Sequence, residues 1–479
     1  MRMLAVCGLV AILGAIGNRA SPATATPTLS PCRVPGGKEI IRCGRLEVPE
    51  TWDKPGGRQI SLNIMVLPKL GSGPEQAPMV WIDGGPGVPS TNTAALYTDE
   101  LKFHRERRAI LMFDQRGTGG SGALHCPTIE HQSPLADLWT AADVLSCRRA
   151  LAAHADLAQY STVAAAHDLD AVRSALGYEK VDLAGLSYGT LLAQTYMDLY
   201  PAHVRSVVLI GTVPLGEKLP LHHAANGEHA LRQVFEDCRS DAKCNAAFPR
   251  LRSDWAALEQ RLSKAPIVIR TAQDALSVRA GPFNEFIRGM MNTPEGQRRL
   301  PLMISRIARG DDGLLVKAVK SQGPGPESEG LYLSVTCPEM TRRIRPAEIG
   351  PAVAGSSFGR YRIDQQIAAC RFWPHGGPAP NLRPRLRSDI PVLLLSGGRD
   401  ATTPTAWAER VAAGLPNSRV LVFEHMAHLP VGLENVICVD RIMDAFFSKA
   451  SAQVLDASCR ASMAPPPFAI APPQAQSEG

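Results

Sequence analysis

Long hydrophobic runs are missing from this chain beyond its first residues. The run at residues 4–16 is too short to span a bilayer comfortably, and no later segment is long enough. The 51 Lys and Arg residues against 45 Asp and Glu give a net charge of +6, and the basic residues are scattered. We therefore expect neither nucleic acid nor an anionic membrane as a partner. The sequence sets no oligomeric state.

Two kinds of ligand-binding motif are also absent. There is no Walker lysine and no G-x-G-x-x-G opening a helix, so no phosphate-binding loop is indicated. There is no C-x-x-C, and no cysteine pairs with histidine at zinc-finger intervals. The sequence accordingly implies no metal and no organic cofactor.

The chain has 11 cysteines, and ten of them follow Cys7, which lies in the N-terminal segment. An even number of cysteines in an exported chain favours disulfides, although sequence alone does not fix their connectivity. Short loops cost the least entropy to close, so we predict pairing between sequential neighbours. The predicted pairs are Cys32 with Cys43, Cys126 with Cys147, Cys238 with Cys244, Cys337 with Cys370, and Cys438 with Cys459.

The N-terminal segment is typical of an export signal. Arg2 supplies the positive end, residues 4–16 the apolar part, and residues 23–25 a small-x-small cleavage site. Cleavage after Ala25 gives a signal peptide of residues 1–25, and cleavage after Ala20 is the alternative. We expect the mature protein to be secreted or periplasmic.

Short apolar runs alternate with helical patterns through much of the chain. The runs end in loops rich in glycine or polar residues, and they lie at residues 79–82, 109–113, 181–184, 204–210, 390–396 and 419–423. This alternation predicts an α/β fold, with a mostly parallel sheet covered by helices on both faces. An antiparallel hairpin is predicted at the sheet edge, from residues 46–48 and 60–67.

Residues 212–387 break that rhythm and predict an inserted, largely helical lid domain. The core is then made of residues 26–211 and 388–463. Residues 464–479 are rich in Pro, Ala, Gln and Ser and predict a disordered tail.

The central motif is Gly185-Leu186-Ser187-Tyr188-Gly189, between an apolar run and a helical pattern. At a sharp strand-to-helix turn such a serine is held with its hydroxyl exposed above the sheet, and glycines on both sides avoid backbone collisions. The motif therefore predicts Ser187 as a nucleophile. Because position 187 is not aspartate, epoxide and haloalkane hydrolases are disfavoured.

A serine nucleophile needs a base and an orienting carboxylate. Asp400 and His428 follow the last two predicted strands, in the chain order Ser, Asp, His of the α/β-hydrolase fold. Asp400 has an alternative reading as the cap of a helix near Pro404. His425 is the rival base, but three further residues let the chain turn toward Ser187, which favours His428.

An oxyanion hole needs backbone N–H groups that do not rearrange. We predict that Tyr188 supplies one and Gly85, in the glycine-rich loop after residues 79–82, supplies the other. Asp114 and Arg116, in the next glycine-rich loop, are interpreted as structural residues, with substrate contact by Arg116 as the alternative.

Together these motifs resemble the secreted proline iminopeptidase and tripeptidyl aminopeptidase family of α/β-hydrolases. The resemblance spans about residues 32–459 and rests on Gly84-Gly85-Pro86-Gly87, Asp114-Gln115-Arg116-Gly117 with Ser121, Gly185-Leu186-Ser187-Tyr188-Gly189-Thr190, Leu394-Leu395-Ser396-Gly397 with Asp400, Thr403 and Pro404, and His428. The chain departs from the family at Asp83, where many relatives have histidine. The resemblance implies serine peptidase chemistry at the N-terminal end of peptide substrates.

An aminopeptidase must distinguish a free α-amine from a blocked one, and a lid carboxylate can do this by ion pairing. Our candidate is Glu339, which follows the β-like run at residues 331–336 and adjoins Cys337. The alternative is a surface glutamate in a first helical turn. Two alternative functions remain: an esterase or lipase with the same triad, and an inactive hydrolase fold that serves as a binding protein.

Overall fold

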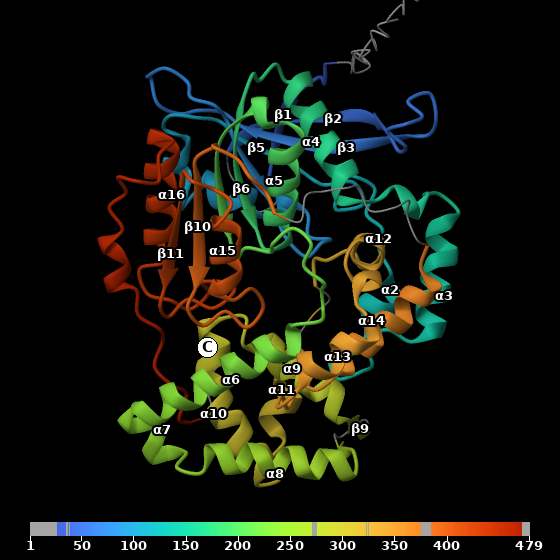
Figure 1. Ribbon diagram of the computed structural model, residues 1–479, viewed down its shortest axis with the longest axis vertical. Helices are drawn as coiled ribbons and strands as arrows, with labels where there is room; N and C mark the ends of the chain where they lie inside the picture. The colour runs from blue at the N-terminus through green and yellow to red at the C-terminus, as the bar shows by residue number, and fades with distance from the viewer. Residues whose placement is uncertain are drawn as a thin grey trace, which may run out of the picture.

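The computed structural model describes residues 26–471 except residues 35, 36, 38, 271–274, 322, 324 and 375–384. The expected export signal at residues 1–25 lies outside the described residues. The described chain is built on a nine-stranded sheet with an insertion before its last two strands (Figure 1).

The strands of the large sheet run parallel from β5 onward, while β1, β2 and β3 pair antiparallel at one edge. The antiparallel edge contains the hairpin predicted from the sequence. In spatial order the strands are β1 (Ser30–Arg33), β2 (Ile40–Pro49), β3 (Gln59–Leu67), β5 (Ile110–Phe113), β4 (Met79–Ile82), β6 (Val181–Leu186), β7 (Val204–Ile210), β10 (Val392–Gly397) and β11 (Ser418–Phe423).

Helices of the core cover both faces of this sheet. They are α1 (Ala94–Thr98), α2 (Pro127–Glu130), α3 (Ala141–Ala152), α4 (Thr162–Ala175), α5 (Tyr188–Leu199), α15 (Thr405–Ala412) and α16 (Ile437–Lys449). Successive strand residues point to opposite faces. Val392 and Leu394 join the hydrophobic cluster that contains α4, α5 and α15, whereas Leu393 and Leu395 join the cluster that contains α1 and α16. The predicted α/β fold with two covered faces is confirmed.

The insertion divides into two parts that pack differently. Its first part builds a separate hydrophobic cluster from α6 (His223–Ser240), α7 (Ala242–Ala247), α8 (Leu251–Lys264), β8 (Ile267–Arg270), β9 (Ala275–Val278), α9 (Ala280–Met290), α10 (Pro294–Ala308) and α11 (Gly313–Ser321). Its second part contains α12 (Glu329–Glu339), α13 (Pro346–Val353) and α14 (Tyr361–Phe372). Residues of α12 and α14 belong to the main core cluster instead.

Two local expectations are corrected. Residues 331–336, interpreted from sequence as β-like, lie in the middle of α12 and are all buried. Residues 464–471 contact the first part of the insertion. Phe468 is buried beneath the guanidinium of Arg298, and the N–H of Ala469 donates to the Arg298 carbonyl. The expected disordered tail therefore does not begin at residue 464.

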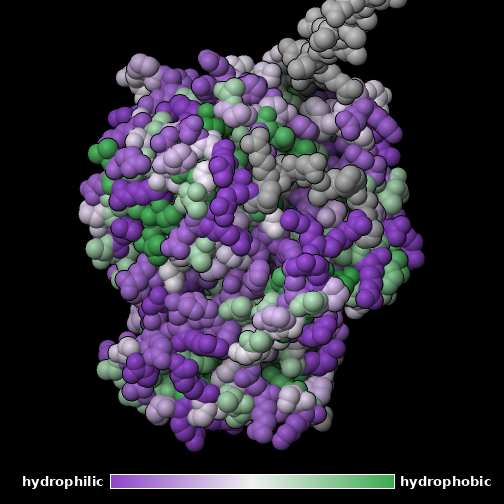
Figure 2. Space-filling model, viewed as in Figure 1, coloured by the Kyte–Doolittle hydropathy of each residue, from purple (hydrophilic) through white to green (hydrophobic). Residues whose placement is uncertain are grey.

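The surface drawn in Figure 2 is mostly hydrophilic, and its hydrophobic residues form small areas among polar ones. Within the described part of the chain, no helix combines the length and the apolar character needed to cross a bilayer.

The structure joins the ten cysteines in the five sequential pairs expected from the sequence. The bond Cys337–Cys370 links α12 to α14 and closes a separation of 33 residues, whereas Cys238–Cys244 closes only 6.

Removing the longer loop should therefore be the more destabilising change. We expect Cys337→Ala/Cys370→Ala to lower the free energy of unfolding by about 4 kcal/mol, and Cys238→Ala/Cys244→Ala by about 2 kcal/mol, because the unfolded chain regains more entropy from a longer loop. Urea unfolding of the two double variants measures both losses. An equal or larger loss from Cys238→Ala/Cys244→Ala would contradict this account.

Candidate active site

Ser187 occupies a sharp turn between β6 and α5. Its backbone has φ 54° and ψ −120°, a conformation that non-glycine residues rarely adopt. The turn is tight because α5 approaches the sheet closely: a Cβ on Gly189 would lie 2.2 Å from the carbonyl oxygen of Ile82. Glycine at this position lets the helix begin directly above the strand ends.

Ser187, His428 and Asp400 lie in one hydrogen-bonded line. His428 Nε2 is 3.0 Å from Ser187 Oγ, and His428 Nδ1 is 2.9 Å from Asp400 Oδ2. The three residues follow β6, β11 and β10, whose carboxyl ends share one edge of the parallel sheet. His425, the rival base, is half-buried and does not line the cavity above Ser187.

Asp400 is fixed by its own loop. The backbone N–H groups of Thr402 and Thr403 donate to Oδ1 at 2.7 and 2.8 Å, and the Thr403 hydroxyl donates to Oδ2 at 2.6 Å. Burial acts to raise the pKa of Asp400, but His428 and the Thr403 hydrogen bonds outweigh it and hold the pKa below its usual range. Asp400 therefore stays ionised, and it orders the loop before α15 as well as facing His428.

Gly84 brings the glycine-rich loop after β4 against Ser187. A Cβ on Gly84 would lie 2.9 Å from the Cβ of Ser187, so a side chain there would push the loop away. Tyr188 is the first residue of α5, and its N–H has no partner within the helix. Gly85 follows in the same loop and lines the same cavity.

Asp114 and Arg116 are held away from this cavity. Arg116 forms a buried ion pair with Asp168 at 2.6 Å and donates to the Glu50 carbonyl, while Asp114 accepts from the N–H and hydroxyl of Thr91. Neither residue lines the cavity above Ser187. Their contacts match the structural interpretation made from the sequence.

The cavity above Ser187 has a volume of about 490 Å³, a size typical of small-ligand sites. The core contributes Asp83, the glycine loop and the Ser187–His428 pair. The insertion contributes several charged and polar side chains, namely His223, Arg288, Glu327, Tyr332 and Arg362.

Glu327 is an acid of the insertion that lines this cavity. A Cβ built on Gly85 would lie 3.5 Å from Glu327 Oε1, and the N–H of Ser328 donates to the Gly87 carbonyl at 3.0 Å, which ties the two loops together. Burial raises the pKa of Glu327 to about 7, with further contributions from the Glu329 and Asp83 carboxylates.

The sequence did not single out Glu327. It lies in the glycine, proline and serine stretch at residues 321–330, where no periodic pattern assigns a direction to a side chain. The available signal was the pair of acids, Glu327 and Glu329, in an otherwise uncharged loop.

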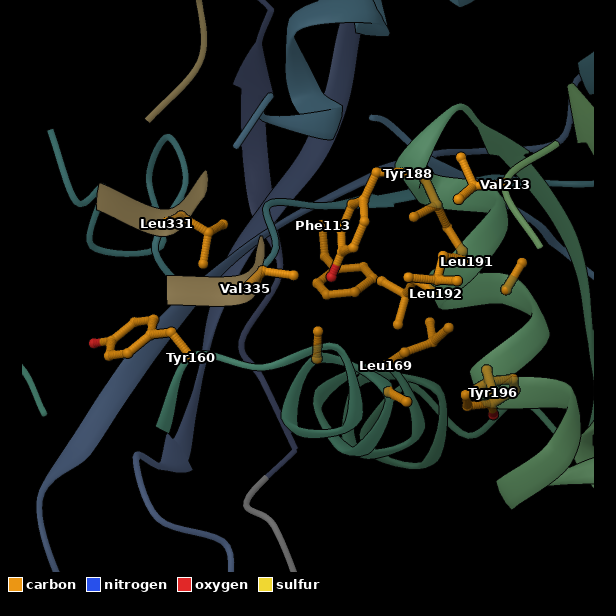
Figure 3. Close-up of a cluster of buried hydrophobic side chains, with 14 of the residues drawn as sticks. Phe113, Tyr160, Leu169, Tyr188, Leu191, Leu192, Tyr196, Val213, Leu331 and Val335 are labelled. Carbon is orange, nitrogen blue, oxygen red and sulfur yellow. The ribbon is translucent and has the colours of Figure 1, made fainter. Parts of the chain in front are cut away.

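Glu339, the candidate named from the sequence, is not among the residues that line the cavity. Its carboxylate accepts from the N–H and the hydroxyl of Thr162 at 2.7 and 2.5 Å, at the start of α4. The Thr162 hydroxyl is in turn 2.9 Å from that of Tyr188. Figure 3 shows Val335 of α12 and Tyr188 in the same cluster of buried side chains, so this part of the insertion packs into the core that carries Ser187. Burial raises the pKa of Glu339 to about 7.

Comparison with known proteins covers most of the chain. Residues 77–285 match the family model described as alpha/beta hydrolase fold, and residues 354–459 match the one described as TAP-like protein.

Three curated relatives align along most of their length. Serine protease Hip1 of Mycobacterium tuberculosis is 25% identical over an alignment of 517 positions, which covers 95% of this chain and 95% of its own. Tripeptidyl aminopeptidase of Streptomyces lividans is 25% identical, covering 89% of this chain and 85% of its own. Carboxylesterase B of M. tuberculosis is also 25% identical, covering 85% of this chain and 84% of its own. The chain is therefore a serine hydrolase of the α/β-hydrolase fold, and its residues 354–459 are similar to the TAP-like proteins.

Proposed function

We propose that the protein is an exported aminopeptidase that releases residues or short peptides from the N-terminal end of peptide substrates. Its relatives support peptidase chemistry, and the five disulfides support an oxidising compartment. The observation that carries the proposal is an acidic side chain, Glu327, beside the glycine loop of a cavity that also holds the serine.

In this mechanism Ser187 Oγ attacks the scissile carbonyl while His428 Nε2 takes its proton. Asp400 holds the imidazole in the tautomer that carries hydrogen on Nδ1, and it stabilises the imidazolium that forms. The N–H groups of Tyr188 and Gly85 hold the oxyanion. His428 then protonates the leaving amine, and water completes hydrolysis of the acyl-enzyme.

Glu327 is the residue that we assign to the substrate's free α-amine, in place of Glu339. When no ammonium is bound, an ionised Glu327 beside the glycine loop works against the negative charge that develops on the oxyanion. A substrate ammonium neutralises that carboxylate, so catalysis favours substrates with a free amine. An acetylated amine carries no charge and leaves the carboxylate unpaired.

The test is Glu327→Gln, assayed on peptide anilides with free and acetylated amino ends. We expect the ratio of kcat/KM for the free substrate to that for the acetylated one to fall by about 10- to 100-fold, the effect of one hydrogen-bonded charge pair. Because the pKa of Glu327 is about 7, the wild-type ratio should rise as the pH passes upward through 7. It should fall above about pH 8 as the α-amine loses its proton.

Glu339→Gln is the matched control, since it removes a buried carboxylate of similarly raised pKa that does not line the cavity. Its free-to-acetylated ratio should stay that of the wild type. A ratio that falls in Glu339→Gln and not in Glu327→Gln would reverse the assignment.

Esterase activity is the second candidate, favoured by the similarity to carboxylesterase B. Both functions use the same triad, so the comparison of free and acetylated peptide anilides decides between them. An esterase would hydrolyse short acyl esters efficiently and show no preference for a free amine on any peptide.

A further inference from the structure

The cavity above Ser187 carries a second charged cluster, formed by the insertion. His223 begins α6, Arg288 lies in α9 and Arg362 in α14, and all three side chains line the cavity. None of them has a role in the mechanism described above. This cationic cluster faces the same space as Glu327 and Asp83.

The carboxylate of Glu285 lies close to both arginines of the cluster. Glu285 accepts from Arg288 Nε at 3.1 Å and lies 3.9 Å from Arg362 Nη1. Arg362 also donates to the Tyr332 hydroxyl at 2.7 Å, and its guanidinium lies 4.6 Å from the centre of the Trp139 ring. Glu327 and Glu329 act on Arg362 electrostatically, but burial raises the pKa of both acids, so they are weak counterions.

Donors of the cluster are left without partners. His223 is 6% exposed, and neither of its ring nitrogens has a hydrogen-bond partner among the described residues. Arg362 Nε is likewise buried without an acceptor among the described residues. Buried polar groups are rarely left unpaired, so unused donors on a cavity wall indicate a ligand that accepts hydrogen bonds.

We propose that His223, Arg288 and Arg362 bind a carboxylate of the substrate. This inference deepens the proposed function and rests on it: the substrate would bring its ammonium to Glu327 and a carboxylate to the cationic cluster. Guanidinium groups match carboxylates in shape and charge, and a neutral imidazole N–H adds a third donor. The carboxylate belongs either to an acidic side chain near the substrate's N-terminus or to the free C-terminus of a short peptide.

The first experiment uses two 4-nitrophenyl esters with acyl chains of equal length, the pentanoate and the hydrogen glutarate. They differ by a terminal carboxylate and lack an amine. We expect Arg288→Gln to lower the glutarate-to-pentanoate ratio of kcat/KM by about 10- to 100-fold, and His223→Leu to lower it by about 10-fold. A ratio unchanged in both variants would overturn the proposal.

Arg239→Gln is the matched control, because Arg239 also pairs with a glutamate three residues before it but is exposed and lies outside this cavity. Its ratio should equal that of the wild type. Arg288→Lys keeps the charge and should restore part of the ratio. A fall in Arg239→Gln as large as that in Arg288→Gln would show a general charge effect and count against the site.

Peptides then separate the two sources of the carboxylate. An Asp-for-Asn exchange in the second residue of a peptide amide tests the side chain, and a free acid against its amide tests the C-terminus. Preference for the acidic member of either pair, lost in Arg288→Gln, supports the proposal, and preference in neither contradicts it. Because the esters carry no amine, their result stands even where the free-amine preference fails.

Discussion

Ser187→Ala is expected to lower kcat by about 10⁶-fold while leaving the protein folded. The hydroxyl is the only group that attacks the carbonyl, and a triad without it retains only what the oxyanion hole and substrate binding supply, about 10³- to 10⁴-fold over water. Ser187 Oγ contacts His428 at the wall of the cavity rather than the hydrophobic core, so its removal costs one hydrogen bond and no core packing. Alanine also keeps the backbone turn between β6 and α5 free of new contacts.

Labelling by a fluorophosphonate probe measures the reactivity of Ser187, and circular dichroism measures whether the variant is folded. The wild type should be labelled at Ser187 and the variant should not be labelled, with identical spectra. Ser253→Ala serves as the control, since Ser253 is exposed on α8 and its hydroxyl donates to the Arg250 carbonyl at the N-cap of its own helix. Turnover by folded Ser187→Ala within 10-fold of the wild type would remove the serine mechanism, and an unlabelled wild type would support a binding protein without catalysis.

The residues of this site that can be predicted from the sequence are those that directly follow the strands of the sheet. Each of Ser187, Asp400 and His428 follows a short buried strand, and parallel strands bring their carboxyl ends to one edge whatever the loops do. The glycines around Ser187 report close backbone approach, a local requirement that a sequence displays directly. By this route the sequence predicts the fold and the three residues Ser187, Asp400 and His428, whereas the disulfide partners were predicted from the low entropy cost of closing short loops.

The insertion was harder to predict because tertiary packing overrides its local signals. Residues 331–336 include Tyr, Val and Thr, which favour strands, yet they form a helix that is buried by α3, α14 and the core. Such a helix has no polar face and shows no 3.6-residue period. Glu327 depends on a hydrogen bond from Ser328 to Gly87, between segments 241 residues apart, and nothing local in the sequence encodes it.

The same limitation explains the choice of Glu339. Its position next to Cys337 is visible in the sequence, but the direction of its side chain follows from where α12 packs. In the structure that direction is toward the first turn of α4 and Thr162, beneath Tyr188. The sequence alone does not distinguish an acid that packs behind Tyr188 from an acid that lines the cavity, because the difference depends on how the helix packs.

His428→Ala should lower kcat by about 10⁶-fold, and His425→Ala should lower it by less than about 3-fold. His428 is the one histidine within hydrogen-bond reach of Ser187 among the described residues, and it is oriented by Asp400 on its other nitrogen. His425 lies three residues earlier in the same loop and does not line the cavity, so its removal changes neither the proton path nor the cavity wall. The two substitutions are chemically identical and close in the chain, which makes each the control for the other. The hydrolysis rate of one ester by each variant separates them, and circular dichroism checks that both variants are folded. A larger loss in His425→Ala than in His428→Ala would mean that the loop after β11 places His425 against Ser187 instead.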